Sequence, residues 1–140
     1  MPLTINLKPH ERLIVNGVVI ENSGPSAKLL IHNTAALLRE KDILTEEQAT
    51  TPARRIYFAI QCQYLFPGKS DVFLPIIQNF LAEFEQAAPS TAPLVADVRE
   101  LVGDGQFYRA LKSARQLLVR EEGILNEFTR EGLSKNTGAR

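Results

Sequence analysis

Basic side chains in the first half of the chain are the groups best suited to chemistry with a partner. Lysine and arginine hold phosphate groups, and an imidazole or an amide can read the edge of an unpaired base. The candidates for RNA contact are Lys8, Arg12, Lys28, His32, Asn33, Arg39, Lys41, Arg54 and Arg55. If folding brings these positions to one face, they would form an RNA-binding surface; if not, they would only solvate the exterior.

Two of these candidates lie at the start of a predicted helix. Thr51 suits the N-cap and Pro52 suits the first helical position, so Arg54 and Arg55 fall in the first turn. The first N–H groups of a helix have no partner within it and favour an anion such as phosphate. The helix start therefore adds a phosphate site to the predicted surface.

Side chains that could form a catalytic or metal centre are few. His10 and His32 fall in a predicted loop and strand, with no further ligands at metal spacing. Cys62 falls in a predicted helix and has no base partner that would make it a nucleophile. We therefore expect no enzyme activity, no metal site and no cofactor.

Length and charge limit the classes of protein that fit. The 140 residues suit one domain or one unit of two subdomains, and the 16 basic side chains balance the 16 acidic ones. Attraction to nucleic acid must therefore come from a local patch. No apolar run approaches the roughly 20 residues of a transmembrane helix, and one cysteine suits a reducing compartment, so we expect a cytoplasmic protein without membrane contact.

The elements that must position these side chains change type near residue 50. Residues 1–50 predict an antiparallel β region, in which Leu13–Ile20 forms a hairpin around Asn16-Gly17. Further strands are predicted from Leu3 and from Lys28, while residues 35–40 fit either one helical turn or a strand. Residues 1–50 therefore predict a small N-terminal antiparallel sheet.

Residues 51–131 predict a helical region, because apolar residues there recur at intervals of three and four. The expected helices are Pro52 to about Phe66, 72–87 with Pro75 in its first turn, 92–102 and 107–128. Residues 132–140 have little to bury and predict a flexible tail. The expected fold class is α+β, a small antiparallel sheet region followed by a bundle of about four helices.

The last predicted helix carries an apolar seam that could face a partner. Its members recur at intervals of seven residues or lie on the neighbouring row of the helix. They are Phe107, Leu111, Leu118, Leu125 and Phe128. Glu121 and Gly123 interrupt the pattern, so we expect a bundle edge or a short partner-facing seam and not a long coiled coil.

Three segments resemble the FlbT family in order and spacing. They are Leu7–Arg12 leading into Val15-Asn16-Gly17, Leu38–Ile43, and Thr51–Phe58. The resemblance extends over about residues 2–130. It implies a post-transcriptional regulator that binds the 5′ untranslated region of flagellin messenger RNA, represses translation and promotes decay of the message. Such a regulator acts by occupying the leader and needs no catalysis.

A second hypothesis is a protein-binding adaptor or export chaperone for flagellin or another flagellar regulator. The zero net charge and the apolar seam favour it. Self-association into a homo-oligomer fits either hypothesis. The two differ in whether the chief partner is the flagellin messenger leader or a protein.

Overall fold

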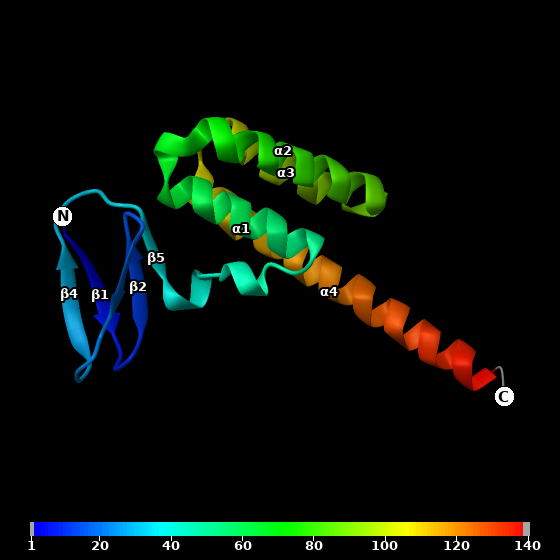
Figure 1. Ribbon diagram of the computed structural model, residues 1–140, viewed down its shortest axis with the longest axis horizontal. Helices are drawn as coiled ribbons and strands as arrows, with labels where there is room; N and C mark the ends of the chain where they lie inside the picture. Colours follow the sequence, from blue (N-terminus) through cyan, green and yellow to red (C-terminus); the bar gives the residue numbers. More distant parts are fainter. Residues whose placement is uncertain (1, 139–140) are drawn as a thin grey trace.

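The computed structural model describes the backbone of residues 2–138 and the side chains of residues 2–125. Figure 1 shows the strands at one end of the molecule beside a group of helices. The strands are β1 (Leu3–Leu7), β2 (Arg12–Val15), β3 (Val18–Glu21), β4 (Ala27–Ile31) and β5 (Leu37–Arg39). The α-helices are α1 (Pro52–Leu65), α2 (Ser70–Ala87), α3 (Ala92–Gly103) and α4 (Phe107–Gly138). The predicted α+β fold class is confirmed.

The strands form two antiparallel sheets and not one, with β1 against β4 and the order β3-β2-β5 in the second sheet. The reason lies in β2, where consecutive residues Leu13 and Ile14 are both buried. Successive side chains of a strand point to opposite faces, so β2 needs apolar partners on both sides. Leu13 packs with Ile5 and Leu7 of the first sheet, whereas Ile14 joins the core formed by the helices.

The predicted Asn-Gly hairpin is confirmed. Val15 pairs directly with Val18, and the two turn residues have positive φ, 50° at Asn16 and 85° at Gly17. Both values belong to the tight turn that matches the twist of a hairpin. Gly17 is also required by space, since a Cβ there would lie 2.7 Å from Cε1 of Phe66.

The ambiguous segment 35–40 contains both predicted structures in turn. Its middle forms β5, which pairs with β2, and the chain then enters a 3₁₀ turn, η1 (Glu40–Asp42). A second turn, η2 (Glu46–Gln48), leads toward the first helix. The chain between β5 and α1 is therefore short and largely hydrogen-bonded, and it holds the sheets against the helices.

Helix α1 lies centrally and packs on α2 and α4. Its predicted start is confirmed, because the Thr51 side chain accepts the N–H of Arg54. Ile56 and Ile60 are fully buried and lie one turn apart, as the apolar spacing predicts. Two further turns, η3 (Pro67–Lys69) and η4 (Pro89–Thr91), flank α2 and shorten the connections between helices.

The predicted position of Pro75 in the first turn of its helix is wrong. Helix α2 begins at Ser70, so Pro75 lies in the second turn. Proline has no N–H, and the carbonyl of Asp71 therefore lacks its usual helical donor. The sequence argument failed because the turn η3 at Pro67 allows the chain to enter α2 two residues earlier than predicted.

Helix α4 continues past the predicted end at Phe128 to Gly138. The predicted tail, 132–140, lies outside the residues whose side chains the structure describes, and its flexibility stays a prediction. So does the division of the chain near residue 50, across which Ile14 and Leu38 share a core with the helices. No helix in the described part of the chain combines the length and the apolar character needed to cross a bilayer.

Candidate nucleic-acid interface

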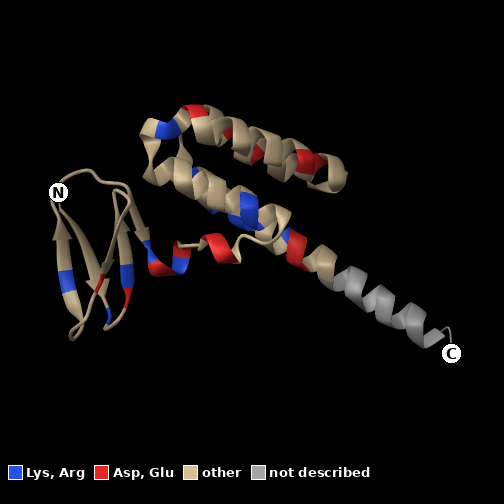
Figure 2. Ribbon diagram, viewed as in Figure 1, with Lys and Arg blue, Asp and Glu red and all other residues tan. Residues whose placement is uncertain are grey.

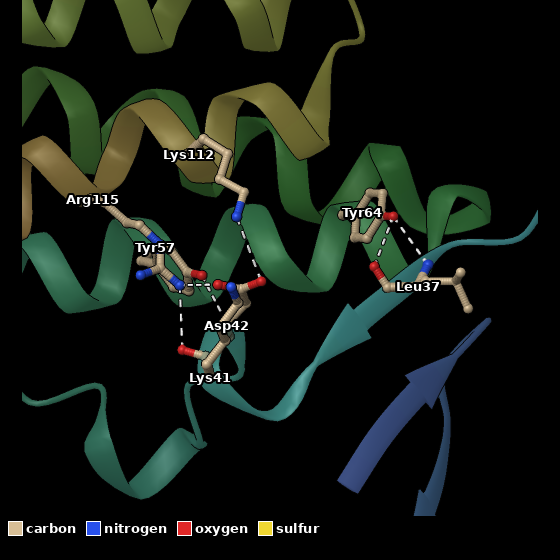
Figure 3. Close-up of polar contacts among 7 residues, drawn as sticks. All are labelled: Leu37, Lys41, Asp42, Tyr57, Tyr64, Lys112 and Arg115. Carbon is tan, nitrogen blue, oxygen red and sulfur yellow. Dashed lines mark hydrogen bonds and ion pairs between the residues drawn. The ribbon is translucent and has the colours of Figure 1, made fainter. Parts of the chain in front are cut away.

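A buried carboxylate joins the link between sheet and helices to α4. Asp42 at the end of η1 is only 5% exposed, and its two oxygens are held by the guanidinium of Arg115 and by the ammonium of Lys112, 3.6 Å away. Figure 3 shows both cations pointing from α4 toward Asp42. Arg115 also donates to the carbonyl of Lys41 at 3.3 Å. Two cations thus converge on one anion.

Two tyrosines of α1 complete the attachment of this link. The Tyr57 hydroxyl donates to the carbonyl of Asp42 at 2.6 Å, and the Tyr64 hydroxyl accepts from and donates to the backbone of Leu37 (Figure 3). Burial raises the pKa of both tyrosines, so each stays a neutral donor at physiological pH. We name Asp42, Tyr57, Lys112 and Arg115 the Asp42 cluster.

Further cationic and aromatic side chains, at least partly exposed, lie next to the Asp42 cluster. Lys112 lies 5.2 Å above the ring of Tyr108, whose side chain is 42% exposed. Arg39, Tyr64 and Tyr108 line one open cavity of about 360 Å³ between β1, β5 and the helices. We define the junction surface as Arg39, Lys41, Tyr108, Lys112 and Arg115. Lys112 and Arg115 share the carboxylate of Asp42, and exposed Glu40 adds one more carboxylate beside the four cations, so positive charge is in excess.

The junction surface contains two of the nine predicted RNA positions, and a third lies beside it. Arg39 donates to the carbonyl of Asn6, and Lys28 is directly opposite Asn6 in the β1–β4 pair. Lys41 follows in η1 and is exposed. Positions 39 and 41 therefore belong to the junction surface, and position 28 lies on the strand paired with the one that Arg39 contacts; RNA contact by any of them stays a prediction.

The remaining N-terminal candidates are not brought to that surface by any contact in the described structure. Arg12 on β2 pairs with Glu21 of β3 at 3.1 Å, which neutralises it locally. Lys8 lies in the turn after β1, and His32 and Asn33 follow β4, all exposed. Figure 2 shows Lys and Arg spread over strands and helices, with Asp and Glu distributed among them.

The start of α1 is not the open anion site that the sequence predicts. A carboxylate of the chain itself already occupies it, because Glu121 of α4 accepts the N–H of Ala53 at 2.8 Å. The N–H of Arg54 is bonded to Thr51. The prediction of free N–H groups is therefore wrong: Glu121 follows Ala53 by 68 residues and only folding brings it there.

Acidic side chains also surround the two arginines of that helix start. Arg54 lines one cavity with Glu121 and Glu122, and Arg55 lines another with Glu83 and Glu121. A phosphate approaching either arginine would meet these carboxylates. The arginines are exposed, yet their surroundings lower their value as phosphate ligands compared with the cations of the junction surface.

Three functional candidates on α4 were missed by the sequence argument. Tyr108, Lys112 and Arg115 occupy positions i, i+4 and i+7, which share one face of a helix. That spacing was visible in the sequence and could have placed the three side chains together. What it could not show is that this face meets Asp42 and Lys41 from the other half of the chain.

Most of the predicted partner seam is used inside the chain. Leu111 is 1% exposed in the core, and Phe107 and Leu118 pack against that core. The prediction that Leu111 faces a partner is therefore wrong. Leu125 is 49% exposed, and the side chain of Phe128 lies outside the described residues. A seven-residue repeat fits an intramolecular helix contact as well as an intermolecular one.

The only cysteine offers no sign of reactivity. Burial raises the pKa of the Cys62 thiol, and Glu46 nearby adds to the effect, so the thiol stays protonated at neutral pH. Among the residues that the structure describes, no three His, Cys, Asp or Glu side chains gather as metal ligands do. The side chains that gather are the cationic and aromatic ones at the junction surface.

Fold and site together define a small α+β protein that presents cations and an exposed tyrosine where the sheets meet the helices. Comparison with known proteins identifies a family over nearly the whole chain. The family model described as Flagellar protein FlbT matches residues 3–125. The chain belongs to the FlbT family. No solved structure matches it significantly.

Relatives from several bacteria are similar along most of their length. A protein of Rhodopseudomonas palustris, named probable flagellum biosynthesis repressor protein FlbT, is 40% identical over 129 residues, which cover 90% of this chain and 99% of the relative. The corresponding protein FlbT 1 of Bradyrhizobium diazoefficiens is 39% identical, covering 91% and 88%. The flagellum biosynthesis repressor protein FlbT of Caulobacter vibrioides is 35% identical, covering 92% and 93%.

Proposed function

We propose that this chain is a cytoplasmic repressor of flagellin synthesis that binds the 5′ untranslated region of flagellin messenger RNA. The observation that supports RNA contact is the junction surface, where four cations and an exposed tyrosine lie together on a molecule of zero net charge. Relatives named as repressors of flagellum biosynthesis support the regulatory part of the proposal.

The junction surface suits a single-stranded leader better than a duplex. Unpaired bases stack on exposed aromatic rings, and Tyr108 offers such a ring next to Lys112. Lys41, Arg39 and Arg115 would hold the phosphates on either side of a stacked base. Occupation of the leader would then block the ribosome and expose the message to nucleases, so repression and decay require no catalytic group on the regulator.

Two double variants, each removing two positive charges, test this site. Lys41→Gln with Lys112→Gln removes charge from the junction surface, and Arg54→Gln with Arg55→Gln removes it from the start of α1. Binding of a flagellin leader is measured by titration at several salt concentrations. Each lost phosphate contact lowers the salt slope by about 0.7 for single strands, so we expect a decrease of about 1.4 for the junction variant and little change for the other.

The possible results separate three conclusions. Weaker binding of the junction variant alone supports the site. Equal weakening of both variants would mean that only total charge matters, and the site assignment would be lost. If the leader binds no better than an unrelated RNA of equal length, messenger recognition itself is rejected, whichever residues contribute.

A second candidate function, the protein-binding adaptor or export chaperone, is favoured by one feature of the helices. A cavity of about 500 Å³ opens between the start of α1, the end of α2 and α4. Its walls include Phe80, Phe84, Ile124 and Leu125, the last two partly exposed. Such an apolar groove could receive side chains of a flagellin helix.

Co-purification from cells with and without ribonuclease distinguishes the two functions. A flagellin or regulator that remains bound after RNA digestion, and that is lost when Leu125 is changed to Asp, supports the adaptor. Loss of the partner on digestion, together with recovery of the flagellin leader, supports the RNA-binding repressor. The junction double variant serves as the control, because it should affect only the RNA.

A further inference from the structure

Strand β3 is an edge strand with an unusual surface. It pairs with β2 and ends the order β3-β2-β5, and its three apolar residues are exposed: Val18 and Val19 by 61% and Ile20 by 40%. Proteins normally protect such edges with charges, proline or bulges, because an exposed apolar edge invites another strand. The run Val18–Ile20 carries none of these protections.

The hairpin geometry shows which backbone groups of β3 are free to pair. A two-residue turn closes on a hydrogen-bonded pair, here Val15 with Val18, and such pairs then alternate along the ladder. The alternation places Ile20, opposite Leu13, in the next hydrogen-bonded pair. Asn22 continues the same alternation, because its N–H donates to the carbonyl of Glu11 at 3.0 Å. Val19 and Glu21 lie between these pairs, so their N–H and C=O groups point away from β2 toward the open edge.

We propose that β3 pairs antiparallel with β3 of a second copy of this chain, across a twofold axis. The two three-stranded sheets would join into one sheet of six strands, order β5-β2-β3 followed by its symmetric copy. Identical apolar edges are self-complementary in such an arrangement, as a twofold interface requires. The pairing would cover the apolar run that is otherwise open to solvent, and it does not depend on the RNA-binding proposal.

Charge and turn geometry select one register. The ladder between copies must use Val19 and Glu21, whose polar backbone groups face outward. Pairing Glu21 with its own copy would oppose like charges, and pairing Val19 with its own copy would bring Glu21 to the turn residue Gly17, whose φ of 85° does not continue a strand. Pairing Val19 with Glu21 of the other copy remains, and it places Ile20 on the twofold axis.

Contacts at both ends of β3 fix the conformation of this edge strand. Asn16 in the turn accepts the N–H of Ala36 on its side chain and donates its own N–H to the carbonyl of Ala36, both at 2.9 Å. The Phe66 ring lies against Gly17. At its other end β3 is fixed by the ion pair between Glu21 and Arg12. Because β3 is already ordered, pairing costs little conformational entropy.

Two substitutions at one position test the register. Val19→Glu would place a carboxylate opposite Glu21 of the other copy, twice in each dimer, whereas Val19→Lys would place an ammonium there. Both introduce one charge at the same exposed site, so their effects on folding are matched, and thermal unfolding checks this. Sedimentation equilibrium of the RNA-free full chain should show a dimer for the wild type, dimerisation about tenfold weaker for V19E, and a retained dimer for V19K.

A cross-linking experiment provides a second test that does not depend on charge. With Cys62→Ser as background, Ile20→Cys would face its own copy at a Cα separation of about 4.5 Å, which suits a disulfide. Val18→Cys is the control, because its two copies would be about 13 Å apart along the strands. Oxidation should link I20C and leave V18C unlinked.

Three results would overturn the proposal. The first is a wild-type chain that stays monomeric at all concentrations measured, even if another protein's strand binds to it. The second is equal dimerisation of V19E and V19K, and the third is equal cross-linking of I20C and V18C. RNA binding is measured in parallel, and a loss of dimer with unchanged leader binding leaves the proposed function intact.

Discussion

Two places on this molecule gather arginine or lysine against helices, and they differ in what surrounds the charge. At the start of α1, Arg54 and Arg55 share cavities with three carboxylates, those of Glu83, Glu121 and Glu122. The junction surface has four cations and fewer carboxylates: buried Asp42, which pairs with Lys112 and Arg115, and exposed Glu40. The sequence predicts the arginines of α1 and, at the junction surface, only Arg39 and Lys41; the fold adds Lys112 and Arg115 and shows which carboxylates lie beside each group.

The comparison teaches that a helix start and two arginines do not make an anion site when the chain supplies its own anion. Glu121 accepts the N–H of Ala53 and offsets the positive end of the helix. At the junction surface the cations outnumber the carboxylates, and Tyr108 adds an aromatic face. A phosphate would therefore meet repulsion at the first place and attraction at the second.

The largest effect is expected on replacing Asp42 with Ala. This would leave the ammonium of Lys112 and the partly buried guanidinium of Arg115 without the carboxylate that pairs with both. Breaking a fully buried pair costs about 3–5 kcal/mol, and since both cations are nearly half exposed we expect a loss of about 2 kcal/mol in the free energy of unfolding. Urea unfolding measures it, with the exposed neighbour Glu40→Ala as control. Equal stability of the two variants would show that the Asp42 cluster does not hold the halves together.

A smaller effect is expected at the other place, where Glu121 is replaced by Ala. The variant loses a hydrogen bond to Ala53 and a negative charge at a helix start, together worth about 1 kcal/mol. Glu122→Ala removes an adjacent exposed carboxylate and should change stability by less than about 0.5 kcal/mol. If urea unfolding finds the two variants equally stable, Glu121 does not stabilise the start of α1 as a hydrogen-bond acceptor.

Local signals allowed much of the fold to be predicted. Asn16-Gly17 requires positive φ wherever it occurs in a tight hairpin, and Thr51-Pro52 satisfies a helix start with its own side chain and ring. Neither depends on distant residues. The burial of both faces of β2 could also have been predicted, because Leu13 and Ile14 are adjacent apolar residues. The sequence argument nevertheless placed all the strands in one sheet.

The candidate site was harder to predict from the sequence, because its contacts join distant parts of the chain. Lys41 and Arg115 meet across 74 positions, as do Ala53 and Glu121 across 68. Spacing within one helix can group Tyr108, Lys112 and Arg115, and it cannot show which anion they meet. For the same reason the repeat through Leu111 could not distinguish a partner seam from the chain's own core.

The smallest effect is expected in the pH dependence of the free energy of unfolding, which reports on the burial of Tyr57, the residue of α1 that donates to the carbonyl of Asp42. Burial raises the pKa of Tyr57 above its usual 10.0, an increase that Arg115 partly offsets. Because the folded-state pKa exceeds the unfolded one, the stability from this group is complete below about pH 10 and decreases as pH rises through the folded value. Tyr57→Phe lacks the ionisable hydroxyl, so the difference in free energy of unfolding between wild type and variant should narrow as the pH rises from about 9 to about 11. All other ionisable groups are present in both proteins and cancel in this difference. A gap that stays constant would mean that the Tyr57 hydroxyl ionises as easily in the folded chain as in the unfolded one, and the junction would be more open to water than its burial indicates.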